Sequence, residues 1–138
     1  AFGHTVLLVP EKLRAVASQW TLMKRSPWIF GGVLVFINPF LEEVFWRGYL
    51  FSKWSLHVQH RHVIVLTALF YASYHFITTI RIFSLSMAIF LTGIVFLAGL
   101  FWGYCRSTYD SVWCAIISHM WADVAIVVVY VKYFLPRV

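Results

Sequence analysis

Charged residues are scarce in this chain, and acidic residues are the scarcest. Only 12% of the 138 residues are Asp, Glu, Lys or Arg, with five acids against eleven bases, whereas 62% are hydrophobic. A water-soluble domain of this length has too little interior to hide so much apolar surface, while lipid solvates that surface directly. The composition therefore excludes an ordinary soluble domain and predicts a membrane protein with a single domain over residues 1–138.

Cysteine and dense basic runs are also scarce. Cys105 and Cys114 are the two cysteines, and neither belongs to a CxxC or other metal-binding spacing, so we expect two free thiols. The Lys and Arg residues stand mostly between apolar runs, and no basic run is interleaved with aromatics as a nucleic-acid groove requires. Such charges are typical of the flanks of membrane spans. The expected partner is therefore the lipid bilayer and not nucleic acid.

Residues 1–9 contain no Lys or Arg and only a short apolar run, so we expect that they are not a cleavable signal peptide. Between Pro10 and Ser26, apolar positions recur at helical spacing among charged ones. This pattern predicts an interfacial amphipathic helix within residues 1–26, with a partner-binding helix as the alternative.

Four apolar stretches follow, at 28–51, 62–79, 82–104 and 111–135. At 1.5 Å per residue, stretches of about 20 residues match a hydrocarbon core of about 30 Å. The predicted fold class is all-α, a polytopic membrane bundle of about four transmembrane helices after the amphipathic helix. We expect a multi-pass integral membrane protein, in the plasma membrane if the source is prokaryotic. Five tryptophans fall toward the predicted span ends, as indole rings favour the headgroup region: Trp28, Trp46, Trp54, Trp102 and Trp113.

Three of the five acids and two of the six histidines lie inside these apolar stretches: Glu42, Glu43, Asp123, His75 and His119. A charged side chain at bilayer depth costs roughly 2.5 to 3.5 kcal/mol on insertion scales, so such residues usually mark a functional site. Polar groups at this depth face the bundle interior. We therefore expect the first, second and fourth spans to pack with these side chains converging, and the uncharged third span to serve as scaffold.

The spacing predicts different roles for the two glutamates. Arg47 lies four residues after Glu43, on the same helix face, so the two can neutralise each other. Glu42 points about 100° around the helix and is left desolvated, able to take a proton from water. Glu43 acting as the base is the alternative.

The histidines fall into one pair and one isolated residue. His119 and Asp123 are four residues apart on one face, and a carboxylate there can orient the imidazole. His75 has Tyr71 one turn before it, whose hydroxyl can reach the ring. A hydrogen-bonded packing histidine is the alternative reading of His75.

Together these residues form a known pattern. The sequences EEVFWR from Glu42 to Arg47, YASYH from Tyr71 to His75 and HMWAD from His119 to Asp123 resemble the CPBP intramembrane proteases, whose motifs are EExxxR, FxxxH and HxxxN or HxxxD in that order. This family includes the CAAX prenyl endopeptidases and bacteriocin-processing or Abi-type proteins. Tyr71 stands where Phe is usual. The resemblance covers roughly Trp28 to Leu135, and family members usually carry more helices before the first motif, so we expect a fragment or a minimal member.

The resemblance implies an endopeptidase that acts on a peptide or on a prenylated, membrane-associated protein. Glu42 and His75 would activate water, His119 and Asp123 would stabilise the oxyanion, and Glu43, Arg47 and Tyr71 would support them. We expect no obligatory metal, because EExxxR lacks the paired ligands of HExxH. If zinc were bound, its ligands would be Glu42, His75 and His119.

Two other classes of function are compatible with buried acids and histidines. One is a transporter or ion-binding protein with a proton or cation relay, and the other is a catalytically silent membrane scaffold. The loop histidines His57, His60 and His62 are expected to be interfacial. The positive-inside rule places the N-terminal segment in the cytoplasm, whereas the family's prenyl-protein proteases open to the cytosol and Glu42 lies nearer the opposite face. The orientation is left open.

Overall fold

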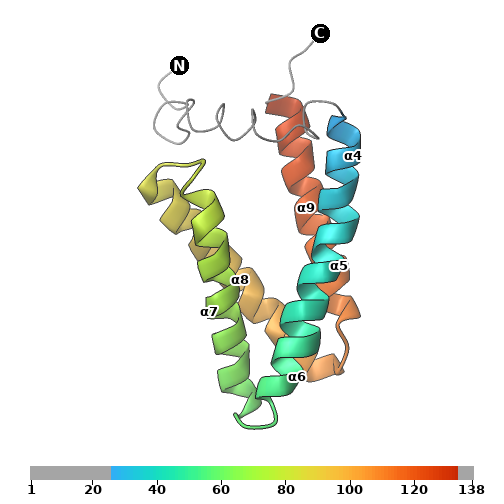
Figure 1. Ribbon diagram of the computed structural model, residues 1–138, viewed down its shortest axis with the longest axis vertical. Coiled ribbons are helices and arrows are strands. Elements are labelled where there is room, and N and C mark those ends of the chain that lie inside the picture. Colours follow the sequence, from blue (N-terminus) through green and yellow to red (C-terminus); the bar gives the residue numbers. More distant parts are fainter. Residues whose placement is uncertain (1–25, 134–138) are drawn as a thin grey trace.

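The computed structural model describes residues 26–133, and all the regular elements within them are helices, which confirms the predicted all-α class (Figure 1). The first helical stretch is continuous and changes its hydrogen-bond register several times. Its segments, in which η denotes a π-helix, are α4 (Pro27–Gly32), η1 (Val33–Ile37), α5 (Asn38–Glu43), η2 (Val44–Leu50) and α6 (Phe51–Trp54). Three uninterrupted helices follow: α7 (His60–Thr79), α8 (Leu85–Tyr109) and α9 (Trp113–Tyr133).

Three helices in the described residues are long and apolar enough to cross a membrane: Trp28–Trp54, His60–Thr79 and Leu85–Tyr109. The fourth predicted span corresponds to α9, whose apolar part, Trp113–Val129, is shorter. Large apolar side chains on these helices face outward, as expected of surfaces that meet lipid, with Phe36 62% exposed and Phe90 61% exposed. The predicted amphipathic helix lies outside the described residues.

The helices form two antiparallel pairs: α7 with α8, and the first helical stretch with α9 (Figure 1). Helix α7 packs along α8 over the longest interface, while α9 lies against α5 and η1. The pairs meet near α6 and spread apart toward the end where α4 begins. The predicted site residues lie on the first stretch, α7 and α9, so the arrangement of these pairs decides whether the residues meet.

Small residues allow α7 and α8 to approach closely. A Cβ atom built on Gly99 would lie 3.1 Å from the Ala68 Cα, and one built on Gly103 would lie 3.1 Å from the Ile64 Cγ2. A Cβ atom built on Gly93, which lies closer to the N-terminal end of α8, would have no such neighbour within 4 Å. Two of these three α8 glycines are therefore required for packing.

The π-helical segment η2 starts immediately after Glu43 and contains Arg47. In a π-helix each N–H bonds a carbonyl five residues back, which rotates the following side chains relative to an α-helix. The register change therefore helps to set the direction of Arg47 relative to Glu42 and Glu43, which precede it. Single-turn π segments in helices are frequent at functional sites.

Candidate active site

The ion pair predicted between Glu43 and Arg47 is present and completely buried. Arg47 Nη1 lies 2.8 Å from Glu43 Oε1, and both side chains are 0% exposed. Arg47 Nη2 donates to the Gly99 carbonyl at 3.2 Å, and the guanidinium carbon lies 4.7 Å from the centroid of the Tyr71 ring. A buried charge is tolerated only when it is paired and hydrogen-bonded in this way.

Glu43 also binds His119. The Glu43 Oε1 atom lies 3.1 Å from His119 Nδ1. Since an ionised carboxylate can only accept, Nδ1 carries the hydrogen and Nε2 is directed away from Glu43. Trp102 stacks on the imidazole, with ring centroids 4.3 Å apart and planes inclined by 19°, and its Nε1 donates to Ser118 Oγ at 2.9 Å. The imidazole is thus held on its edge and on one face.

Asp123 contacts His119 more loosely than its spacing suggested. The Asp123 Oδ2 atom lies 3.8 Å from His119 Nε2, beyond hydrogen-bond distance, and this buried oxygen makes no hydrogen bond within the described part of the chain. The two residues share a helix face, as predicted. The carboxylate that orients the imidazole is nevertheless that of Glu43.

Glu42 has a different environment from its neighbour. The Tyr71 hydroxyl donates to Glu42 Oε2 at 3.0 Å and lies 3.4 Å from His119 Nε2. Glu42 is only half-buried, and it lines a hollow of about 280 Å³. The rest of that lining is Leu41, Phe45, Trp46 and Tyr74. Of the two glutamates, Glu42 is therefore the one that solvent and ligands can reach.

His75 is placed by the backbone of α7. Its Nδ1 lies 3.0 Å from the Tyr71 carbonyl, which can only accept, so Nδ1 donates and Nε2 is the ring atom available to a ligand. The His75 and Tyr71 rings are 4.3 Å apart. The expectation that the Tyr71 hydroxyl would serve His75 is not met, since that hydroxyl bonds Glu42.

The structure brings the first helical stretch, α7 and α9 together as predicted, and it adds α8. The third span is more than scaffold, because it supplies the Gly99 carbonyl to Arg47 and the Trp102 ring to His119. Trp102 was expected near the headgroups, yet it is 5% exposed and belongs to the core around Tyr71. From its sequence position near a span end, a tryptophan in the headgroup region cannot be distinguished from one in the core.

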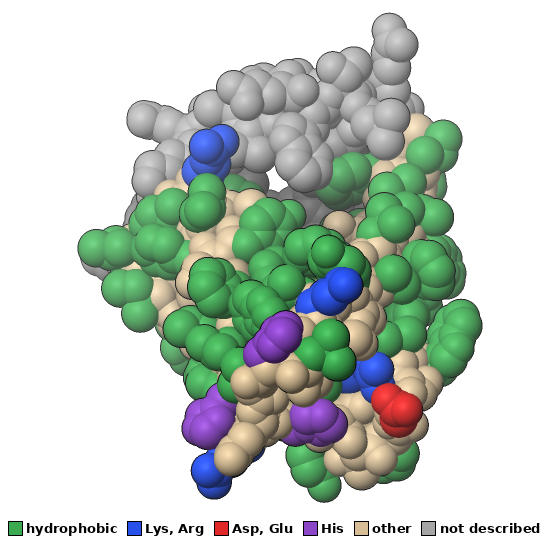
Figure 2. Space-filling model, turned by 60° about the horizontal axis from the view of Figure 1, so that its bottom comes forward, with side chains coloured by type: hydrophobic (Ala, Val, Ile, Leu, Met, Phe, Trp, Pro, Cys, Tyr) green, Lys and Arg blue, Asp and Glu red, His purple; other side chains and the backbone are tan. Residues whose placement is uncertain are grey.

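The residues named for a possible zinc ion do not form one ligand set. No group of three His, Cys, Asp or Glu side chains among residues 26–133 is arranged to hold a metal ion. The Nδ1 atoms of His119 and His75 bond Glu43 and the Tyr71 carbonyl, so Nε2 is the ring nitrogen that each histidine leaves available. The loop histidines His57, His60 and His62 are exposed. Figure 2 shows histidine side chains at the surface of the face that it presents, and their interfacial position stays a prediction.

Comparison with known proteins bears on the same residues. A family model matches residues 24–125, and its description is type II CAAX prenyl endopeptidase Rce1-like. This range contains all of the predicted site residues, from Glu42 to Asp123. No curated protein and no solved structure gives a significant match.

Proposed function

Because the chain belongs to the Rce1-like family of type II CAAX prenyl endopeptidases, we propose that it is an integral-membrane endopeptidase whose attacking water is activated by Glu42. Membership places the chain in a protease family, and its three span-length apolar helices indicate a membrane protein. The observation that carries the proposal is the unequal access to the two glutamates. Glu42 lines an open hollow, whereas Glu43 is 0% exposed.

Glu42 is suited to act as the general base. Peptide hydrolysis requires a group within hydrogen-bond reach of the attacking water. The Tyr71 hydroxyl fixes Oε2 of Glu42, so that Oε1 is left to bind a water in the hollow. His75 presents Nε2 from the neighbouring helix, where it can accept a hydrogen bond from the same water, and the proton that Glu42 takes from the water passes to the leaving amine.

His119 supplies a donor for the tetrahedral oxyanion, since the single hydrogen of the Tyr71 hydroxyl is donated to Glu42. With Nδ1 bound to Glu43, the His119 Nε2 faces the Tyr71 hydroxyl and Asp123. If all three acids are ionised, Glu42, Glu43 and Asp123 contribute −3 against +1 from Arg47, a balance of −2. The proposed role requires hydrogen on both ring nitrogens of His119, with Nδ1 bound to Glu43 and Nε2 directed to the oxyanion. Oxyanion donors of this kind contribute about 100- to 1,000-fold to turnover.

The walls of the hollow favour an apolar substrate. Leu41 is 59% exposed, Phe45 48% and Tyr74 46%, so the rim of the hollow is an aromatic and aliphatic surface on the outside of the bundle. A peptide that carries a prenyl group, or one already held in the bilayer, would bury its chain there. We therefore take a prenylated C-terminal peptide as the substrate class, in keeping with the family's name.

No step of this mechanism passes through a metal. Among residues 26–133 no three His, Cys, Asp or Glu side chains are arranged to hold a metal ion, and Arg47 places a positive charge beside Glu43. We propose hydrolysis without an obligatory metal, with the lipid bilayer as a further partner.

The test is hydrolysis of a farnesylated CAAX peptide by the purified protein in lipid nanodiscs, with products identified by mass spectrometry. We expect cleavage next to the prenylated cysteine, no inhibition by 1,10-phenanthroline, and loss of cleavage in Glu42→Gln. Asp110→Asn is the matched control, since the Asp110 side chain is 93% exposed and outside the site. Cation or proton flux without proteolysis would favour a relay protein over the proposed protease.

A further inference from the structure

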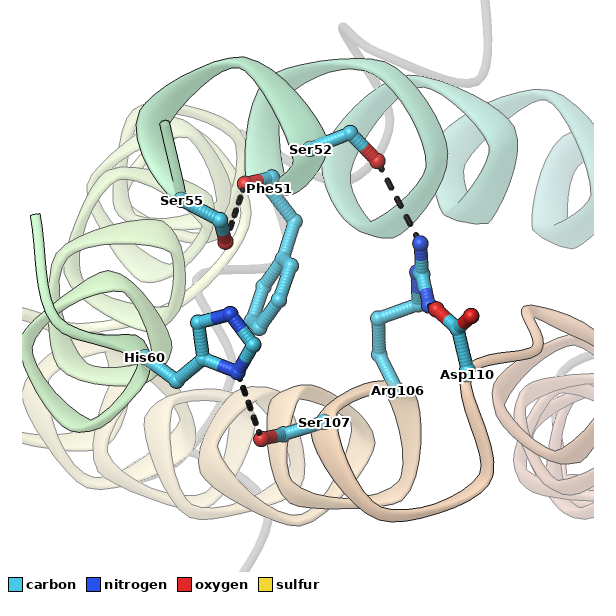
Figure 3. Close-up of a pocket in the computed structure, with 7 residues that line it drawn as sticks. All are labelled: Phe51, Ser52, Ser55, His60, Arg106, Ser107 and Asp110. Carbon is cyan, nitrogen blue, oxygen red and sulfur yellow. Dashed lines mark hydrogen bonds and ion pairs between the residues drawn. The ribbon is translucent and has the colours of Figure 1, made fainter. Parts of the chain in front are cut away.

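Arg106, in the last turn of α8, reaches inward to the helix that carries the two glutamates. Its Nε donates to the Arg47 carbonyl at 3.0 Å, and its Nη2 lies 3.3 Å from Ser52 Oγ. Nη1 is paired with Asp110. The guanidinium carbon lies 5.7 Å from the centroid of the Phe51 ring. Figure 3 shows Arg106 between Ser52 and Asp110 in a pocket of about 290 Å³.

The Arg47 carbonyl occupies a special place in the first helical stretch. Within η2 the bonds run five residues back, and the last of them joins the Phe51 N–H to the Trp46 carbonyl. From Phe51 onward the helix is α-helical, with the Ser55 N–H bonding the Phe51 carbonyl four residues back. A helix that returns from five-back to four-back bonding passes over one carbonyl, the next after Trp46. That carbonyl belongs to Arg47, and Arg106 is its partner.

Arg47 is therefore held at two points. Its side chain binds Glu43, and its carbonyl binds Arg106. A buried carbonyl without a partner costs free energy comparable to a lost hydrogen bond, so the register of η2 is favoured only while the Arg106 bond is present.

We propose that Arg106 is a positioning residue for the active site, which clamps the end of η2 and so fixes the direction of Arg47 relative to Glu43 and Glu42. This inference rests on the proposed function of Glu42. Arg106 lies outside the three motifs, on α8, the helix that the sequence predicted to be scaffold.

The bond to the Arg47 carbonyl carries this role, while the other two contacts of Arg106 are peripheral. Asp110 is exposed at the end of α8, where exposed ion pairs contribute little. Ser52 is exposed as well, and water in the pocket can replace its hydroxyl. Removal of either partner leaves the Nε bond in place, so Asp110→Asn and Ser52→Ala are matched controls.

The variants to compare are Arg106→Lys and Arg106→Gln. Lysine keeps the positive charge but has one ammonium group in place of the planar guanidinium fork, so it cannot hold the carbonyl and the outer partners together. We measure kcat and KM for a farnesylated CAAX peptide, the thermal unfolding midpoint, and amide hydrogen exchange in two segments. These segments are 44–52, which the clamp holds, and 63–72 in α7, which it does not touch.

We expect Arg106→Lys to lower kcat about tenfold and to leave KM within about twofold, as for a group that orders the reacting residues rather than binding substrate. Exchange in 44–52 should rise about tenfold while exchange in 63–72 stays at the wild-type rate. The two control variants should match the wild type in all four readouts.

Two results would overturn the inference. One is wild-type kcat and wild-type exchange in both Arg106 variants. The other is a uniform rise of exchange in both segments with a lowered unfolding midpoint, which would show a general structural role. If the wild-type protein cleaves no peptide, the proposed function fails, and exchange in 44–52 still decides whether the clamp exists.

Discussion

Glu43 on α5 accepts a hydrogen bond of 3.1 Å from Nδ1 of His119 on α9, 76 residues later in the chain. The same Glu43 oxygen lies 2.8 Å from Arg47. One buried carboxylate therefore joins the first motif to the third and fixes the proton of His119 on Nδ1. The role that the i, i+4 spacing suggested for Asp123 is performed by a residue from a different helix.

Replacing Glu43 should lower the stability of the fold around the site, and not only the rate of turnover. In Glu43→Gln the fully buried Arg47 loses its counter-charge, and breaking a buried pair on one side typically costs about 3–5 kcal/mol. Unfolding in denaturant followed by circular dichroism measures the loss, with Asp110→Asn as the control. A Glu43→Gln protein with wild-type stability would show that Arg47 does not depend on this carboxylate.

The Tyr71 hydroxyl should tune Glu42 without being essential. Tyr71→Phe removes the 3.0 Å bond to Glu42 and the 3.4 Å contact with His119 but keeps the buried ring under Arg47. A neutral hydrogen bond contributes about 0.5–1.5 kcal/mol, so kcat should fall by at most about tenfold. Steady-state kinetics on the farnesylated peptide checks this. Complete loss of turnover would make the hydroxyl a catalytic donor in its own right.

Gly99 should be intolerant of any side chain, unlike Gly93 on the same helix. A Cβ on Gly99 would meet the Ala68 backbone at 3.1 Å and Arg47 Nη2 at 3.3 Å, whereas Gly93 has open space. Overpacking of this kind costs about 1–3 kcal/mol, so Gly99→Ala should lower stability and activity together. Gly93→Ala should be neutral or slightly stabilising, since alanine favours helix by up to about 1 kcal/mol. Equal stabilities of the two variants in thermal unfolding would contradict the packing of α7 on α8.

Asp110 should have no influence on the pH dependence at moderate pH. The Arg106 guanidinium lowers the pKa of Asp110 below its usual value, so the folded protein keeps this carboxyl ionised more strongly than the unfolded chain does. Its contribution to stability is therefore complete above the unfolded pKa of about 4 and is lost as pH falls through the lowered pKa. Unfolding midpoints of wild type and Asp110→Asn should run parallel from about pH 5 to 8. Curves that diverge in that range would show a different ionisation of Asp110.

The sequence was sufficient for the helices and for the polar residues that face each other within one helix. Apolar length located α7 and α8, and buried polar residues at i, i+4 spacing located Glu43 with Arg47 and His119 with Asp123. These signals succeed because helix periodicity and the cost of a charge in lipid both act within one segment.

The sequence could not supply the contacts between segments. Nothing local distinguishes Trp102 in the core from a tryptophan at the headgroups, and nothing pairs Glu43 with His119. The π-helical register of η2 also has no signature in its composition, although it decides which carbonyl Arg106 must hold. These features depend on how α8 and α9 dock, which periodicity along a single helix does not encode.

Glu42, and not Glu43, is the residue that we propose activates the water. The most direct measurement is the rate of farnesylated CAAX-peptide hydrolysis by Glu42→Gln and wild type in the same nanodiscs, after thermal unfolding has shown both to be folded. Because Glu42 is half-buried and unpaired with Arg47, its replacement should leave the fold intact and lower kcat by about 100-fold or more, as expected for loss of a general base. Turnover by folded Glu42→Gln within about threefold of wild type would contradict the account.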